Sequence, residues 1–106
     1  MKIAIIILNW NGKLLLERFL PSVIKYSSDL ANVYVADNAS TDDSINFVYS
    51  NFPKVKVIKN RINGGYTIGY QDAIKHVKEP ILCLLNNDVE VTKNWLSPIL
   101  NIFDKE

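Results

Sequence analysis

The stretch Ile3-Ala4-Ile5-Ile6-Ile7-Leu8-Asn9-Trp10-Asn11-Gly12 decides the fold of this chain. Its first six residues are all apolar, with no alternation between apolar and polar positions. A strand of this composition is buried on both faces, as in a parallel sheet that carries helices on each side. The stretch therefore predicts an α/β protein whose first strand ends in polar residues.

Three further runs rich in Ile, Val and Leu have the length of strands: 33–36, 55–58 and 81–85. The last is continuously apolar, so we expect it to be covered on both faces as well. Segments with helical spacing of apolar residues follow the strands, at Leu15, Leu16, Phe19 and Leu20, at Ile45, Val48, Tyr49 and Phe52, at Ile68, Ala73, Ile74 and Val77, and at Leu96, Ile99, Leu100 and Phe103. Strand followed by helix, repeated four times, implies right-handed crossovers. We expect a Rossmann-like open parallel sheet of about four strands with flanking helices, formed by residues 1–106 as a single domain.

Local signals suggest where the helices begin and break. Thr41, with two aspartates after it, places a cap and negative charge where a helix dipole is positive, and Thr92 is positioned to cap the last helix. Pro21 interrupts the first helical pattern, because proline removes a backbone donor and clashes with the preceding turn. We expect a kink or a restart near residues 19–22.

Composition excludes several classes of protein. At 106 residues, 48% of them hydrophobic, the chain has the size of one small domain with a modest core. A net charge of +1 leaves no field that would gather nucleic acid, so nucleic acid is not an expected partner. The longest apolar run is far shorter than the roughly 20 residues of a membrane helix, and no signal-peptide pattern precedes it. We expect a soluble, cytoplasmic chain in which Cys83 is a buried, unreactive thiol.

Polar residues follow three of the four predicted strands. The first strand leads into Asn9, Trp10 and Asn11, the second into Asp37 and Asn38, and the fourth into Asn86, Asn87 and Asp88. Open parallel sheets bind ligands outside the carboxyl ends of their strands, where the strand order reverses. One polar strand end alone is also how an ordinary loop begins. Three at the same edge predict a ligand site.

The second strand end carries residues suited to a nucleoside. A carboxylate at Asp37, with Asn38 and Ser40 on the following turn, can accept hydrogen bonds from a base imide or a ribose hydroxyl. The alternative is structural: Asp37 and Asn38 form an Asx-type turn, and Asp42 and Asp43 only favour the helix dipole.

A glycine segment, comprising Asn63, Gly64, Gly65 and Tyr66 with Gly69 further on, places small residues and free backbone amides before a helix. A phosphate can approach such a segment closely. The segment is neither a P-loop, since it lacks Gly-Lys-Ser or Gly-Lys-Thr, nor the spaced three-glycine dinucleotide fingerprint. A plain turn explains it equally well.

The fourth strand end is acidic. Asp88, with Asn86 or Glu90 nearby, supplies oxygen ligands for a hard divalent cation, magnesium or manganese, which typically keeps water ligands and bridges the phosphates of a bound nucleotide. Such a cation neutralises charge on a leaving diphosphate. An acidic loop that simply faces solvent is the alternative.

Four segments, 7–12, 35–44, 63–69 and 84–91, follow one another in an order typical of a known family. Together they resemble family 2 glycosyltransferases with the GT-A fold, and most of all the rhamnosyltransferase-like bacterial branch. The resemblance covers essentially the whole chain. Its most specific part is the apolar strand followed by Asp-Asn-Ala-Ser-Thr-Asp at 37–42.

The resemblance implies a donor site for a UDP- or dTDP-sugar. Asn9 and Asp37 would contact the uridine or thymidine, the glycine segment would pass near it, and Trp10 would either stack near the donor or pack in the interior. Asp88 would match the last acid of the family's Asp-x-Asp metal motif, with Asn86 in place of the first. The implied reaction is metal-dependent, inverting transfer of a sugar to a hydroxyl of a glycan or lipid-linked acceptor.

The chain departs from the family pattern in two places. Ile68 adds bulk and Asp72 adds negative charge where the family has a Gly-Phe-Ala-Gly-Gly-like run followed by Asn. No residue matches the general base, which inverting members take from the segment after the metal loop. His76 lies late in the third helix, away from the ligand edge.

We therefore expect the chain to be the donor-binding half of a longer enzyme and to be inactive alone. The alternative is a nucleotide-binding or interaction module without catalysis. A flavodoxin-like or receiver domain is disfavoured, because receivers carry paired acids where this chain has Asn9-Trp10-Asn11.

Overall fold

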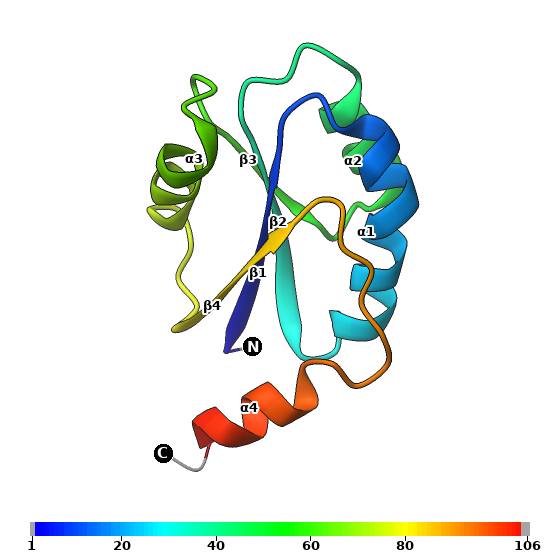
Figure 1. Cartoon of the computed structure of the whole chain (residues 1–106), viewed down its shortest axis with the longest axis vertical. Coiled ribbons are helices and arrows are strands. Elements are labelled where there is room, and N and C mark those ends of the chain that lie inside the picture. The colour runs from blue at the N-terminus through cyan, green and yellow to red at the C-terminus, as the bar shows by residue number, and fades with distance from the viewer. Residues whose placement is uncertain (1, 105–106) are drawn as a thin grey trace.

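A computed structural model describes residues 2–104 and shows one parallel sheet flanked by helices (Figure 1). Strands and helices alternate along the described chain: β1 (Ile3–Asn9), α1 (Lys13–Ser27), β2 (Ala31–Asp37), α2 (Ser44–Asn51), β3 (Lys56–Lys59), α3 (Gly65–Ile74), β4 (Ile81–Asn86) and α4 (Ser97–Asp104). The strand pairs are parallel, and the order in the sheet is β3-β2-β1-β4. The predicted α/β fold with an open parallel sheet is confirmed. None of the helices in this part of the chain has the length and apolar character needed to cross a membrane.

β1 lies inside the sheet and marks the point where the strand order reverses. It pairs with β2 on one side, from Ile3 opposite Ala31 to Asn9 opposite Asp37, and with β4 on the other. The chain therefore leaves β1 toward β2 and β3 and returns to the opposite side for β4. Ligands of open α/β sheets bind outside the carboxyl ends of the strands at such a reversal.

Both faces of β1 are covered, which explains its uninterrupted apolar sequence. Ile3, Ile5 and Ile7 belong to a core shared with α1 and α2, and Ala4 and Ile6 belong to a second core with α3. Figure 1 shows α1 and α2 on one side of the sheet and α3 on the other. Each of these isoleucines is at most 2% exposed, so each contributes about 1.5–3 kcal/mol relative to an exposed side chain.

β4 is an edge strand, and only one of its faces is well covered in the described structure. Cys83 and Leu85 pack against the core on the α1 side, whereas Leu82 and Leu84 are 39% and 50% exposed. Helix α3 packs chiefly against β1 and β2, so it leaves the outer part of this face open. The predicted burial of both faces of this strand is therefore wrong for the residues described.

Cys83 is half-buried rather than fully buried. Burial raises the pKa of its thiol. The neutral thiol is the less nucleophilic form, so its environment agrees with the predicted unreactive cysteine.

Helix α1 runs through Pro21 without a break. Leu16, Leu20 and Val23 on its inner face are each 1% exposed, and their packing holds the turns on both sides of the proline. Proline inside a helix costs about 3 kcal/mol, and burial of three such side chains exceeds this cost. The helix therefore does not restart near residues 19–22, so this form of the prediction is wrong, and a kink within the continuous helix stays a prediction.

The last helix begins later than its predicted cap. Helix α4 starts at Ser97, and the carbonyl of Thr92 accepts a hydrogen bond from the backbone N–H of Trp95 (3.3 Å) in a preceding turn. Trp95 packs against the core, and its Nε1 donates to Ser27 Oγ at 2.8 Å. Because a turn that contains Thr92 and Trp95 precedes α4, the predicted cap at Thr92 is wrong.

Candidate functional site

The ends of β1 and β2 are joined by a buried hydrogen bond between an amide and a carboxylate. Asn9 Nδ2 donates to Asp37 Oδ1 at 3.0 Å, and each residue is 1% exposed. Ser40 also donates to Asp37, from its backbone N–H to Oδ2 (2.8 Å) and from Oγ to Oδ1 (2.7 Å). A buried carboxylate is tolerated when hydrogen bonds replace its water. The side chain-to-backbone turn that the sequence offered as an alternative is therefore present at Asp37.

Asn11 links the loops after β1 and β2. Its backbone φ of 47° is in the left-handed region, which Asn adopts more readily than most residues. Its Oδ1 accepts bonds from the backbone N–H groups of Thr41 (2.7 Å) and Asp42 (3.1 Å), and its Nδ2 donates to Thr41 Oγ1 (3.2 Å). Thr41 is therefore bonded to Asn11, and helix α2 begins only at Ser44, so the predicted cap at Thr41 is wrong.

Asp42 joins the starts of two helices. It accepts bonds from the backbone N–H of Lys13 (3.2 Å) and from the backbone N–H (3.0 Å) and hydroxyl of Ser44. Burial acts to raise the pKa of Asp42, but these hydrogen bonds outweigh it and lower the pKa. Asp42 therefore has the structural role that the sequence allowed for it.

Asn87 connects the loop after β4 to the same point. Its Nδ2 donates to Asn9 Oδ1 at 3.1 Å. Asn9 therefore bonds both to Asp37, at the end of β2, and to Asn87, directly after β4. Gly12 lies against this pair, and a side chain there would collide with Asn9 Oδ1 and Asn87 Nδ2. Polar residues from the ends of β1, β2 and β4 thus meet at one edge of the sheet.

The glycine segment lies on the other side of the β2 end and is held by Asn38. Asn38 is 2% exposed, and its Nδ2 donates to Asn63 Oδ1 and to the carbonyl of Gly65, both at 3.2 Å. Gly65 has a φ of 82°, which glycine adopts without strain. Gly69 faces Asn38 from α3, and a Cβ on it would lie 2.8 Å from both Asn38 Nδ2 and Leu8 Cδ1. The close approach of α3 to Asn38 therefore requires a glycine.

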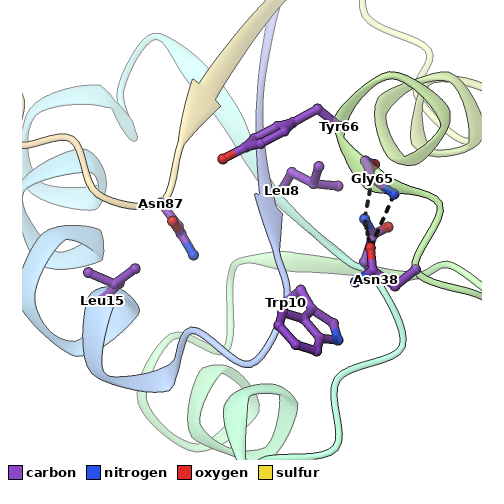
Figure 2. Close-up of a pocket in the computed structure, with 8 residues that line it drawn as sticks. Leu8, Trp10, Leu15, Asn38, Gly65, Tyr66 and Asn87 are labelled. Carbon is purple, nitrogen blue, oxygen red and sulfur yellow. Dashed lines mark hydrogen bonds between the residues drawn. The ribbon is translucent and has the colours of Figure 1, made fainter.

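A pocket of about 380 Å³ opens between these two loop systems (Figure 2). Its lining consists of Leu8, Trp10, Leu15, Asn38, Asn63, Gly65, Tyr66 and Asn87. Figure 2 shows Tyr66 and Trp10 on either side of Leu8, with Asn38 and Gly65 at one end and Asn87 and Leu15 at the other. Trp10 is 54% and Tyr66 68% exposed, so both rings are accessible to a ligand. The volume is within the range of small-molecule sites.

The predicted residues divide into three groups. Five line the pocket: Trp10, Asn38, Asn63, Gly65 and Asn87. Six lie around the pocket without lining it: Asn9, Asn11, Asp37, Ser40, Gly64 and Gly69. Asn86 and Asp88 are exposed and do not line the pocket. The exposure of Trp10 excludes its alternative role in the interior.

The sequence prediction missed Leu8, Leu15 and Asn60, and it named Tyr66 only as part of the glycine segment, without a ligand contact. Leu8, Leu15 and Tyr66 line the pocket, and Asn60 lies behind the glycine segment. Leu8 and Leu15 carry the same apolar spacing as core residues, so no sequence signal marks them. Asn60 follows β3 directly, the strand-then-amide pattern that identified Asn38, and this signal could have found it.

The predicted cation site is sparse. Asp88 is exposed, and among residues 2–104 no group of three or more His, Cys, Asp and Glu side chains is placed to hold a metal ion. A cation at Asp88 would therefore take most of its ligands from a bound diphosphate and water, which is how proteins commonly bind Mg²⁺.

A second pocket, of about 440 Å³, lies toward the amino ends of β3 and β4. Its lining consists of Asn32, Tyr34, Lys56, His76, Lys78, Glu79 and Pro80. Tyr34 Oη donates to Glu79 Oε1 at 2.9 Å, and burial, reinforced by this carboxylate, raises the pKa of Tyr34 to about 12. Exposed His76 lies here, away from the carboxyl ends of the strands as predicted, but it follows the end of α3 at Ile74, so its predicted place within the helix is wrong.

Two solved structures have a fold similar to that of this chain. S. aureus TarS 1–349 in complex with UDP-GlcNAc has a TM-score of 0.85 at 24% identity, over 99% of this chain and 32% of that one. The mannosyltransferase PcManGT from Pyrobaculum calidifontis, in complex with GDP-Man and Mn²⁺, has a TM-score of 0.74 at 21% identity, over 84% of this chain and 28% of that one. The chain thus spans about a third of the length of these proteins, and the likeness shows a common fold.

The sequence itself matches one family and no individual curated protein. No match was found among the curated proteins. The model of the family described as Glycosyl transferase family 2 matches residues 4–106. The narrower resemblance to the rhamnosyltransferase-like branch stays a prediction. Since the family match covers almost the whole sequence and the sheet has the GT-A-like arrangement of the neighbours, the chain belongs to glycosyl transferase family 2.

Proposed function

We propose that the pocket at the carboxyl ends of β1 and β2 binds a UDP- or dTDP-sugar, and that the chain is the donor-binding domain of an inverting glycosyltransferase. The observation that carries this proposal is the position of Asn9. One buried amide bonds both Asp37 and Asn87, and so gathers three loops at the strand-order reversal where such sheets bind ligands. Neighbours of the same fold, solved with UDP-GlcNAc and GDP-Man, support the ligand class.

The pocket offers aromatic faces and amide groups for a nucleoside. Trp10 and Tyr66 provide rings against which a base can pack, worth about 0.5–1.5 kcal/mol per stacked pair beyond the buried area. Asn63 uses its Oδ1 for Asn38 and Gly65, and Asn87 uses its Nδ2 for Asn9. The other end of each amide, Asn63 Nδ2 and Asn87 Oδ1, is assigned here to the ligand.

Asn9 and Asp37 act from behind the pocket wall. Both are 1% exposed and bonded to each other, so their first contribution is to fix the wall. Asp37 Oδ2 accepts the Ser40 N–H, and the contact with the imide N–H of uracil or thymine that the resemblance implies would need the base to reach past the pocket lining. Gly64 and Gly65 begin α3, where backbone N–H groups and the helix dipole favour a diphosphate.

Asp88 is the proposed protein ligand of a magnesium or manganese ion, with Asn86 beside it. A single exposed carboxylate fits a cation that arrives with the nucleotide, not one held permanently by the protein. When bound, the cation would neutralise charge on the leaving diphosphate. The neighbour solved with GDP-Man and Mn²⁺ supports this assignment.

Transfer to an acceptor needs a general base, and the pocket lining contains no carboxylate or imidazole. We therefore propose that this chain supplies donor binding, and that the acceptor, a glycan or a lipid-linked glycan, and the base are provided by protein outside the pocket. The same observation favours the second candidate, a nucleotide-binding module without catalysis.

Calorimetric titration of UDP and dTDP, each with and without MnCl₂, tests donor binding. We expect saturable binding of at least one nucleotide, tightened by Mn²⁺, and no binding of adenosine diphosphate of comparable strength. No heat with either pyrimidine nucleotide would refute the donor role. Release of UDP from UDP-GlcNAc in the presence of a glycan acceptor would separate the transferase from the module.

A further inference from the structure

Asn60 forms hydrogen bonds both to the end of β2 and to helix α3. It lies directly after β3, is 8% exposed, and donates its backbone N–H to the carbonyl of Asp37 at 2.8 Å. Its Nδ2 donates to Asn38 Oδ1 at 2.7 Å and to the carbonyl of Gly69 at 3.1 Å. One side chain therefore ties the end of β2 to helix α3.

The bond from Asn60 decides which way the Asn38 amide faces. An amide side chain has an acceptor oxygen on one side and donor hydrogens on the other. With Oδ1 turned to Asn60, Asn38 presents Nδ2 to two acceptors, Asn63 Oδ1 and the carbonyl of Gly65. The reverse orientation would place like groups together at all three contacts, and buried groups without partners are costly.

The orientation of Asn38 is passed to the pocket through Asn63. Asn63 Oδ1 accepts from Asn38 Nδ2 and from the backbone N–H of Gly65 at 3.1 Å. These bonds hold Gly65 in its left-handed conformation and turn Asn63 Nδ2 away from the network. Both Asn63 and Gly65 line the pocket, whereas Asn60 does not.

We propose that Asn60 is a positioning residue for the donor site. It acts through Asn38 to hold residues 63–65 in the conformation that receives the nucleotide, and it does not touch the nucleotide itself. The identity of the ligand rests on the proposed function, but the order of the segment is measurable without any ligand.

Trypsin cleavage after Arg61 reports on that order, because Arg61 is exposed and adjacent to Asn60. In Asn60→Ala we expect cleavage after Arg61 to rise about tenfold relative to cleavage after exposed Lys54, and UDP affinity to fall about tenfold. Asn51→Ala is the matched control. It removes an exposed amide whose Nδ2 also donates to a backbone carbonyl, that of Phe47 at 2.9 Å, and it should change neither quantity.

Unchanged relative cleavage after Arg61 in folded Asn60→Ala, or UDP affinity equal to that of the unmodified protein, would overturn the proposal. An equal rise at Arg61 and Lys54 would also overturn it, since that result indicates general destabilisation. Failure of the unmodified protein to bind any nucleotide would instead refute the proposed function, while the cleavage ratio would still judge Asn60.

If Asn60→Ala does not fold, hydrogen exchange in the unmodified protein tests whether residues 63–65 are ordered as the proposal requires. The backbone amide of Gly65, which donates to Asn63 Oδ1, should exchange more slowly than the backbone amide of Gly64, by a factor of about ten or more. Equal exchange at the two glycines would contradict an ordered segment.

Discussion

Asp37 and Asn38 are adjacent in the chain but hold opposite walls of the same pocket. Asp37 is the last residue of β2 and Asn38 follows it, and their side chains bond to different loops. Asp37 bonds Asn9 and the turn that contains Ser40, whereas Asn38 bonds the glycine segment at Asn63. The carboxyl end of β2 therefore organises both loop systems of the site.

Replacing Asp37 with Asn should destabilise the fold although the side chain keeps its size. The new amide would turn one acceptor into a donor against Asn9 Nδ2 or the hydroxyl and N–H of Ser40. A buried group without a partner costs about 1–3 kcal/mol, which urea unfolding would measure. Asp29→Asn, at an exposed position, is the control. Equal unfolding midpoints for the two variants would contradict the bracing role of Asp37.

Two glycines of the same segment should respond differently to alanine. At Gly69 the new Cβ would lie 2.8 Å from Asn38 Nδ2 and Leu8 Cδ1, so α3 or Asn38 must shift, and we expect a loss of about 1–3 kcal/mol together with weaker nucleotide binding. At Gly65 no atom lies within 4 Å, but the φ of 82° costs an alanine about 1–2 kcal/mol. Thermal unfolding and UDP titration of both variants check this. Wild-type UDP affinity in Gly69→Ala would show that Asn38 does not shape the site.

Tyr34 should titrate later than an ordinary tyrosine. Burial and the Glu79 carboxylate raise its pKa from 10.0 to about 12. Because the folded pKa is raised, the stabilisation that neutral Tyr34 provides is complete below pH 10 and is lost as the pH rises from 10 to about 12. Ultraviolet titration of the phenolate should show a step near pH 12 that disappears in Tyr34→Phe and moves down in Glu79→Gln. No late step in the unmodified protein would contradict the Tyr34–Glu79 contact.

Asp88→Ala should remove the part of nucleotide binding that depends on a divalent cation. Asp88 is exposed, so the variant should fold normally, and we expect the tightening of UDP binding by Mn²⁺ to fall by about tenfold or more. Asp29→Ala, another exposed acid, should leave that tightening unchanged. Full Mn²⁺ dependence in Asp88→Ala would remove this residue from the cation site.

Strand composition carried most of the predictable information. The unbroken apolar run of β1 correctly indicated a covered strand in a parallel sheet, since both of its faces meet a core. The same pattern in β4 misled, because an apolar sequence shows that a face is suited to burial but not that a packing element lies over Leu82 and Leu84.

Details that depend on distant partners were not predictable in the same way. Thr41 is a residue type that commonly caps helices, but here its backbone N–H donates to Asn11 Oδ1 and its hydroxyl accepts from Asn11 Nδ2, thirty positions earlier in the chain. The convergence of Asn9 and Asp37 followed from parallel topology alone, because the carboxyl ends of neighbouring parallel strands share one edge. The absence of Asp88 from the pocket lining depends on the path of a loop, which local composition does not determine.

Amide chemical shifts during a titration with UDP and the diamagnetic cation Mg²⁺ test the nucleotide site most directly. The account predicts the largest changes at the side-chain amides of Asn63 and Asn87, the backbone amide of Gly65 and the indole N–H of Trp10, all in the pocket lining. Changes concentrated around Tyr34 and His76 at the other pocket, or none at saturating UDP, would contradict it.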